Sequence, residues 1–168
     1  MIRRIQFSPI LMMAMAAFLA LSSSASAQSE KRGFAFDLFG AEVRPTDSDS
    51  DFATEAFGVR GQYRFSNVWA LEGSVSRLSD VDLWFHDASA KAYFVHSDRF
   101  EIYALAGAGA YRLSSITTDA TVHAAIGAEI NVGEKAYLRP EVRGRWLAEE
   151  ARGDDGIVDY SLGFGWRF

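Results

Sequence analysis

The stretch VDYSLGFGWRF, residues 158–168, ends the chain and alternates between two kinds of side chain. Its even-numbered positions are all apolar or aromatic, and its odd-numbered positions are small, polar or charged. Successive side chains of a β-strand point to opposite faces, so this alternation predicts a strand with one wholly apolar face. The preceding residues repeat the pattern.

Seven earlier segments alternate in the same way, and most have about the 9–11 residues that a tilted strand needs to cross a bilayer. The predicted strands are residues 33–43, 55–65, 69–77, 84–94, 100–113, 122–130 and 136–146. Pro140 falls inside the seventh, where its missing N–H removes a ladder hydrogen bond, so we expect a local bulge there. Together with the final stretch, the sequence predicts an eight-stranded all-β protein.

The first residues have the composition of an export signal. Arg3 and Arg4 precede an apolar run over residues 10–21, and the small residues 25–27 form a cleavage site before Gln28. The apolar run is shorter than the roughly 20 residues of a membrane-spanning helix. We therefore predict a cleaved signal peptide over residues 1–27 and a single domain over residues 28–168.

Charge and cysteine content narrow the function further. The chain carries a net charge of −5, and loss of Arg3 and Arg4 with the signal peptide would make it −7. This sign argues against nucleic acid as a partner, because such binding depends on neutralising phosphates. The chain has no cysteine, so it has neither a disulfide framework nor a thiolate nucleophile.

The links between the predicted strands alternate in length. Short polar turns are expected at residues 66–67, 96–98 and 131–135, and longer acidic links at residues 44–54, 78–83, 114–121 and 147–157. Transmembrane barrels have short periplasmic turns and longer outer loops. The alternation therefore favours strands that run up and down across a membrane.

A soluble barrel would show the same period with its apolar face inside, so other features must decide which face points outward. One face combines small residues with charges of both signs, which suits the narrow interior of an eight-stranded barrel. The other has aromatic residues towards both ends of the strands, as at two membrane interfaces. We therefore predict an eight-stranded antiparallel up-and-down transmembrane β-barrel. Its candidate site is a structural cluster of lumen charges: Arg60, Arg64, Glu72, Lys91, Glu129, Arg139, Glu141 and Arg143, with Glu101 on the same face.

Several short motifs carry a family resemblance: residues 62–65, 69–73, 91–94, 100–103, 107–109 and 163–168. In order and spacing they resemble the outer-membrane β-barrel domain family, typified by the transmembrane domain of outer-membrane protein A. The resemblance implies that Glu72, Lys91, Glu129 and Arg139 form an interior salt-bridge cluster. It also implies that the terminal strand is read by the barrel-assembly machinery, through Tyr160, Leu162, Phe164, Trp166 and Phe168. The chain ends at the barrel, so we expect no periplasmic peptidoglycan-binding domain.

The three histidines do not form a recognisable catalytic or metal-binding motif. We expect His96 in a turn, His86 near an outer loop and His123 in the lumen, with no catalytic residue, metal site or cofactor. Acidic loop residues could bind divalent cations or lipopolysaccharide through such cations, although acidic loops are usually only solvated. These residues are Asp47, Asp49, Asp51, Glu149, Glu150, Asp154 and Asp155.

The sequence thus favours a small, monomeric outer-membrane protein of a Gram-negative bacterium, with a structural or interaction role in the cell envelope. Its expected partners are outer-membrane lipid and lipopolysaccharide, and the assembly machinery and periplasmic chaperones during biogenesis. Two alternatives stay open. One is a narrow or gated channel of the porin type, and the other is a lipid A-modifying enzyme.

Overall fold

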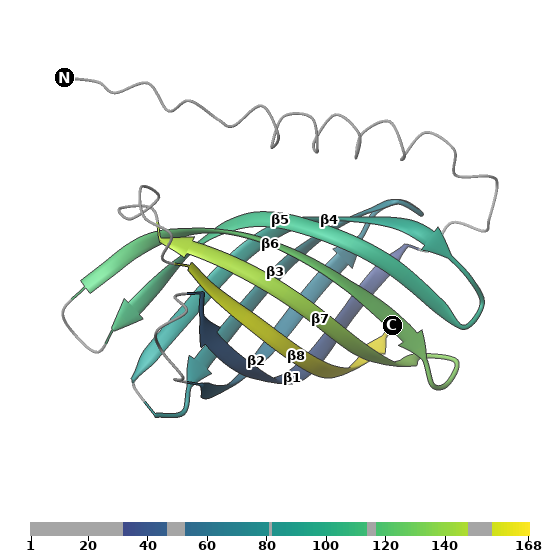
Figure 1. Cartoon of the computed structure of the whole chain (residues 1–168). Coiled ribbons are helices and arrows are strands. Elements are labelled where there is room, and N and C mark those ends of the chain that lie inside the picture. Colours follow the sequence, from purple (N-terminus) through teal and green to yellow (C-terminus); the bar gives the residue numbers. More distant parts are fainter. Residues whose placement is uncertain (1–31, 47–52, 81, 114–116, 148–155) are drawn as a thin grey trace, which may run out of the picture.

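The chain forms one closed antiparallel β-barrel (Figure 1). The computed structural model describes residues 32–46, 53–80, 82–113, 117–147 and 156–168, so the predicted signal peptide and all seven acidic loop residues named above lie outside the described residues. The strands are β1 (Gly33–Pro45), β2 (Thr54–Arg64), β3 (Trp69–Leu78), β4 (Leu83–His96), β5 (Phe100–Leu113), β6 (Thr117–Asn131), β7 (Ala136–Leu147) and β8 (Gly156–Arg167). Each strand pairs with its successor in the chain, which confirms the predicted fold class.

The barrel closes where the last strand pairs with the first. β8 runs antiparallel to β1, with Phe164 opposite Leu38. Beyond the end of β8, the Phe168 N–H donates to the Phe34 carbonyl at 2.9 Å, and the rings of Phe168 and Phe36 stack with centroids 5.8 Å apart. This closure leaves no free sheet edge, which is a requirement for strands that cross a bilayer.

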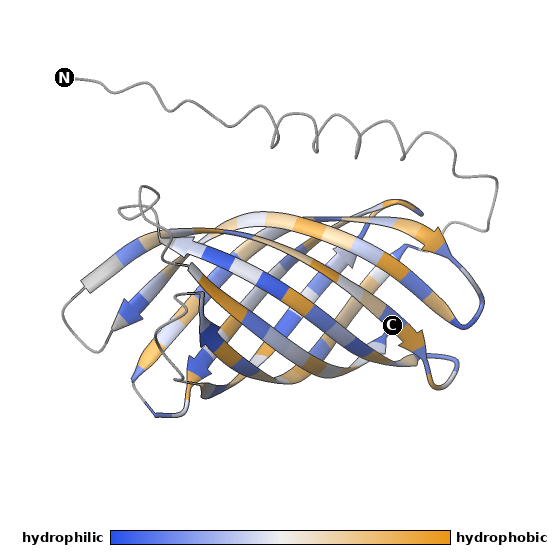
Figure 2. Cartoon of the chain, viewed as in Figure 1, coloured by the Kyte–Doolittle hydropathy of each residue, from blue (hydrophilic) through white to orange (hydrophobic). Residues whose placement is uncertain are grey.

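Alternate residues of each strand point to the two sides of the barrel wall, and Figure 2 shows the resulting change of hydropathy from one residue to the next. Leu38 and Leu162 point outward and are 58% exposed, whereas Tyr103 and Arg139 point inward and are fully buried. The outer face is therefore apolar, and the interior is mainly polar. Within the part of the chain that the structure describes, no helix is long and apolar enough to span a membrane.

Small residues in the wall make room for large side chains in the interior. A Cβ atom built on Gly58 would lie 2.5 Å from Cζ of Phe39, and one on Gly165 would overlap the ring of Tyr137. An eight-stranded barrel is only just wide enough to be filled by side chains, so glycine at these positions provides the needed space.

The predicted asymmetry of the links holds only in part. β6 begins at Thr117, so the link expected over residues 114–121 is reduced to residues 114–116. Thr121 pairs with Gly109 of β5, and the pairing continues to Thr117 opposite Leu113. Threonine is β-branched and suits a pleated strand, which explains why this polar segment extends the ladder instead of forming a loop.

The bulge predicted at Pro140 is wrong. β6 and β7 keep one register on both sides of this residue, with Gly127 opposite Glu141 and Ile130 opposite Leu138. The two intervening pairs are absent from the β6–β7 ladder, but no residue is inserted, and pairing with β8 continues through Pro140. The barrel accommodates the missing N–H of Pro140 by losing two ladder pairs between β7 and β6. The pairs on either side of this gap keep the register.

The irregularity in the sheet lies in β4 instead. The register against β5 shifts between Tyr93 and Val95, which leaves Phe94 as an extra residue. Such bulges redirect side chains. Here Tyr93 stays buried in the barrel, and Phe94 is 41% exposed on its outer face.

Candidate functional site in the barrel interior

The structure places all eight predicted lumen charges inside the barrel, drawn from five of the eight strands. Each of them is at most 7% exposed. They are Arg60, Arg64, Glu72, Lys91, Glu129, Arg139, Glu141 and Arg143. Alternation in the strands produces this arrangement, because every second residue of each strand faces the same enclosed space. A buried charge is costly unless it is paired, so the contacts among these groups decide what the interior can do.

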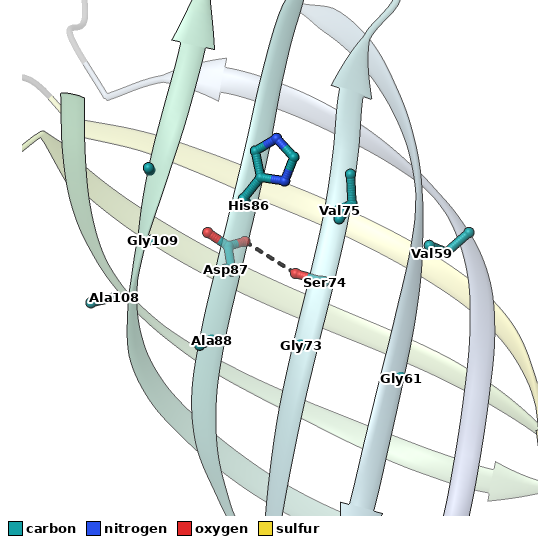
Figure 3. Close-up of a pocket in the computed structure, with 11 residues that line it drawn as sticks. Val59, Gly61, Gly73, Ser74, Val75, His86, Asp87, Ala88, Ala108 and Gly109 are labelled. Atoms are coloured by element: carbon teal, nitrogen blue, oxygen red, sulfur yellow. Dashed lines mark hydrogen bonds between the residues drawn. The ribbon is translucent and has the colours of Figure 1, made fainter. Parts of the chain in front are cut away.

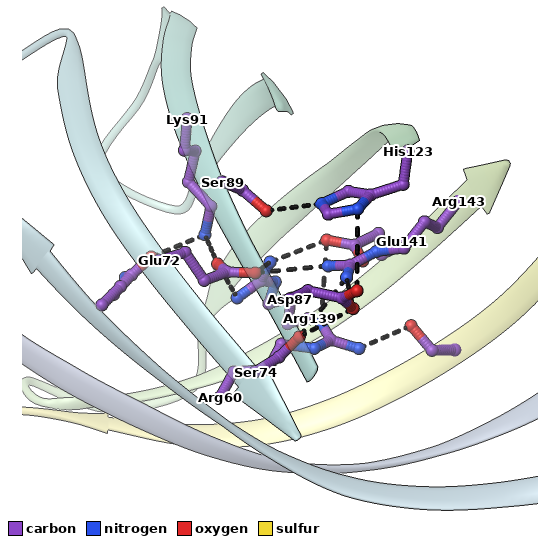
Figure 4. A network of polar contacts seen from close by, with 12 residues as sticks. Arg60, Glu72, Ser74, Asp87, Ser89, Lys91, His123, Arg139, Glu141 and Arg143 are labelled. Atoms are coloured by element: carbon purple, nitrogen blue, oxygen red, sulfur yellow. Dashed lines mark hydrogen bonds and ion pairs between the residues drawn. The ribbon is translucent and has the colours of Figure 1, made fainter. Parts of the chain in front are cut away.

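Arg139 is the centre of the cluster (Figure 4). Its Nη1 lies 3.0 Å from Asp37 Oδ2 and 2.7 Å from Glu72 Oε2, and its Nη2 lies 2.7 Å from Glu141 Oε2. Its Nε donates to the hydroxyl of Tyr103 at 2.6 Å. One guanidinium therefore contacts side chains from β1, β3, β5 and β7, on several sides of the barrel.

Lys91 connects this centre to the short-turn end. Its Nζ lies 2.8 Å from Glu72 Oε2 and 3.3 Å from Glu129 Oε1, and it donates to Gln62 Oε1 at 2.5 Å. Tyr93 donates its hydroxyl proton to Glu129 at 2.7 Å. Glu72 is thus shared between Lys91 and Arg139. Each of these two cations also pairs with at least one other carboxylate.

A second layer of ion pairs lies nearer the short turns. Arg64 binds both carboxylate oxygens of Glu101, at 2.9 and 3.1 Å. Arg167 lies 2.7 Å from Glu129. His96, which was expected in a turn, is the last residue of β4, and its Nδ1 lies 3.0 Å from Glu101.

A third layer lies towards the loop end. Arg143 contacts Asp87 at 3.0 Å and Glu141 at 2.9 Å, and Arg145 contacts Asp87 and Asp159 at 2.7 Å each. The predicted cluster omitted Asp37, Asp87, Arg145 and Asp159. The signal that identifies them is the same alternation, because each lies an even number of residues from an inward-facing neighbour on its strand.

Arg60 is held less closely than the other cations. Its Nε lies 3.7 Å from Asp37 and its Nη1 lies 3.7 Å from Glu141, while its Nη2 donates to Ser161 at 2.8 Å. The guanidinium also lies 3.8 Å from the ring centroid of Phe39. A cation over an aromatic face gains a favourable electrostatic contact that supplements these long ion pairs.

The interior also brings together Ser89, His123 and Asp87. Ser89 Oγ lies 2.7 Å from His123 Nε2, and His123 Nδ1 lies 3.7 Å from Asp87 Oδ1. The second distance is too long for a hydrogen bond. A nucleophilic serine needs a base that is itself oriented by a third group, and only the first of these two contacts is formed.

His86 and the terminal strand lie on the other side of the wall. His86 is exposed on the outer face of β4. The side chains proposed as an assembly signal are exposed by 42–71%: Tyr160, Leu162, Phe164, Trp166 and Phe168. Among the described residues, no three His, Asp or Glu side chains are grouped so that they could hold a metal ion.

A closed barrel with a charged interior and an apolar outer face defines the class of membrane-spanning β-barrels. Residues 13–168 match the outer membrane protein beta-barrel domain, and the chain belongs to this family.

Solved structures of the same architecture are similar along their full length. Neisserial surface protein A has a TM-score of 0.63 at 15% identity, covering 84% of this chain and 100% of its own. The N-terminal barrel of Pseudomonas aeruginosa OprF has a TM-score of 0.66 at 15% identity, covering 82% and 100%. The attachment invasion locus protein Ail of Yersinia pestis has a TM-score of 0.58 at 18% identity, covering 81% and 99%. At these identities the likeness concerns the fold alone. A search of curated proteins finds no match.

Proposed function

We propose that the protein is a monomeric outer-membrane barrel with a passive structural or interaction role in the envelope of a Gram-negative bacterium. The apolar outer face holds it in lipid, and its interior acts as a plug. The observation that carries this proposal is the continuous set of ion pairs around Arg139, which connects opposite sides of the wall. Breaking one pair would leave an uncompensated buried charge, so the contacts resist opening.

A second feature supports a plugged interior. Towards the loop end, an apolar layer of Val43, Ala56, Leu78 and Phe85 faces inward, and each of these residues is at most 6% exposed. An ion would have to cross this apolar layer as well as the charged layers. A narrow channel remains the alternative function, and it would require both to rearrange.

Planar-bilayer recording tests the proposal. We expect the purified protein to give no reproducible unitary currents, because permeating ions would have to displace paired charges at Arg139 and Lys91. Reproducible currents whose conductance changes in Lys91→Gln would contradict the plug and support the channel. Arg44→Gln is the matched control, because Arg44 pairs with Glu42 on the outside of the barrel and its side chain is 60% exposed.

We propose no catalytic role and no cofactor. The enzyme alternative would have to use Ser89, but the contact between His123 and Asp87 that would orient the base is too long. All three side chains are at most 8% exposed, so a lipid substrate has no evident approach.

The proposal includes export by the signal peptide over residues 1–27 and insertion by the barrel-assembly machinery with the help of periplasmic chaperones. Deletion of Phe168 is expected to lower the amount of assembled barrel severalfold. The deletion removes the exposed terminal aromatic residue, its hydrogen bond to Phe34 and its ring contact with Phe36. Heat-modifiable gel mobility of outer-membrane fractions measures the folded form.

Phe168→Tyr is the conservative control for this deletion, and it should assemble normally because it keeps a terminal aromatic side chain. If the deletion variant assembles at the wild-type level, the terminal residue has no role in biogenesis. Lower assembly in cells together with normal refolding in lipid vesicles would attribute the defect to recognition by the machinery and not to stability.

A further inference from the structure

Two arginines and a tryptophan form a row on the outer face at the loop end. Arg77 of β3 is opposite Trp84 of β4, and Trp84 is opposite Arg112 of β5. All three are exposed, and the Arg77 guanidinium lies 5.6 Å from the Trp84 ring centroid. Asp82 pairs with Arg77 at 3.4 Å, in a contact whose side chains are both more than half exposed. Cross-strand neighbours on one face lie close enough to act together, so the row forms one basic and aromatic surface.

The wall is hollowed directly beneath this row. The groove has a volume of about 530 Å³, and Val75 and His86 are among the residues that line it (Figure 3). They lie two residues along their strands from Arg77 and Trp84, towards the membrane centre. Two residues further along the strands, towards the membrane centre, four small residues lie opposite one another across β2 to β5. They are Gly61, Gly73, Ala88 and Ala108.

Large side chains cover much of the outer face elsewhere. At the β1–β8 pairing the outward rows carry large side chains, such as Phe36, Leu38 and Phe164, which are 45–58% exposed. Across β4 and β5 the corresponding positions between the aromatic ends are mostly alanine, so the wall itself forms the surface of the groove. A flexible apolar chain could therefore lie against the backbone here. A second hollow of about 410 Å³ lies over β1, β7 and β8, but its lining includes Glu42 and no arginine or lysine.

We propose that this face binds one phosphorylated membrane lipid, with its phosphate on Arg77 and Arg112 and an acyl chain in the groove. Guanidinium groups suit phosphate because they bind two oxygens at once, and Trp84 lies at the level where aromatic residues meet lipid headgroups. His86 lines the end of the groove next to the charged row, where it can hydrogen bond to the polar linkage of the lipid. Because the row of Arg77, Trp84 and Arg112 lies at the loop end of the barrel, the bound lipid belongs to the outer leaflet.

The charge of the row favours a lipid over a second copy of the chain as the occupant. A second barrel docked in the same way would bring Arg77 and Arg112 close to their own copies, and like charges at close range repel. A phosphate carries the complementary charge. The inference goes beyond the passive role proposed above and does not depend on it, because lipid retention and conductance are measured separately.

Native mass spectrometry of the folded barrel in detergent tests the site. Bis-phosphorylated lipid A is the probe, monophosphorylated lipid A has one phosphate fewer, and diacylglycerol supplies chains without phosphate. We expect one retained lipid A, weaker retention of the monophosphorylated form and no retained diacylglycerol. The double variant Arg77→Gln with Arg112→Gln is expected to lower lipid A affinity about tenfold.

A second variant tests the groove independently of charge. Ala108→Leu fills it and should lower lipid A affinity severalfold, whereas Ala124→Leu adds the same bulk to the outer face of β6, outside the groove. Arg44→Gln controls for the loss of an outward charge. Equal retention by all variants, or a dimer without lipid, would overturn the proposal. Heat-modifiable mobility confirms that each variant is folded.

Discussion

Arg139→Leu is expected to lower the free energy of unfolding by about 3–5 kcal/mol, the effect of removing one partner from a buried ion pair. The substitution leaves the carboxylates of Asp37, Glu72 and Glu141 without the guanidinium that contacts all three at 2.7–3.0 Å. Lys91 and Arg143 still contact two of these carboxylates, so the barrel is expected to be weakened and not abolished. Urea unfolding from lipid vesicles, followed by tryptophan fluorescence, measures the change.

Arg44→Gln is the matched control for this measurement. Its ion pair with Glu42 is exposed on both sides, and such pairs contribute about 0–1 kcal/mol. A loss of less than 1 kcal/mol for Arg139→Leu would mean that the interior charges do not stabilise the barrel as a connected set. Arg139→Lys should lie between wild type and Arg139→Leu, because an ammonium keeps the charge but cannot match the planar geometry of the guanidinium.

Leu38→Arg is expected to lower the free energy of unfolding from lipid vesicles by about 2–4 kcal/mol, the cost of an arginine facing lipid near the membrane centre. Leu38 is 58% exposed on the outer face of β1, about midway between Phe34 near the short turns and Glu42 near the loops. The substitution removes no interior contact. The loss of unfolding free energy therefore tests whether lipid surrounds the outer face at Leu38.

Glu55→Arg controls for depth in the membrane. Glu55 is also exposed on the outer face, on the neighbouring strand and opposite Glu42, at the loop end. An arginine there should change stability by about 0–1 kcal/mol, because the penalty fades near the interface. Equal effects of Leu38→Arg and Glu55→Arg would argue against a lipid layer centred on Leu38.

The strand pattern was readable from the sequence because it depends on neighbouring residues alone. Alternation assigned Leu162 and Phe164 to the outer face and Arg139 to the inner face, as the structure has them. Boundaries were less accurate where polar residues continue a strand, as in residues 117–121. At Pro140 the sequence indicated a defect, but its form depended on the register of the neighbouring strands.

The partners of the interior charges could not be read from the sequence. Arg139 and Asp37 are 102 positions apart in the chain and 3.0 Å apart in the barrel. Ser89 and His123, and likewise Arg77, Trp84 and Arg112, come together only because of the stagger between strands. No local pattern encodes that stagger.

The sequence by itself determined the number of strands, the polarity of each face and the apolar outward row of residues 158–168, because side-chain direction in a strand follows from position alone. The tertiary structure decided which interior charges meet, where the wall is hollow and which outward residues form one surface. These properties depend on register and closure, which are set by all eight strands together.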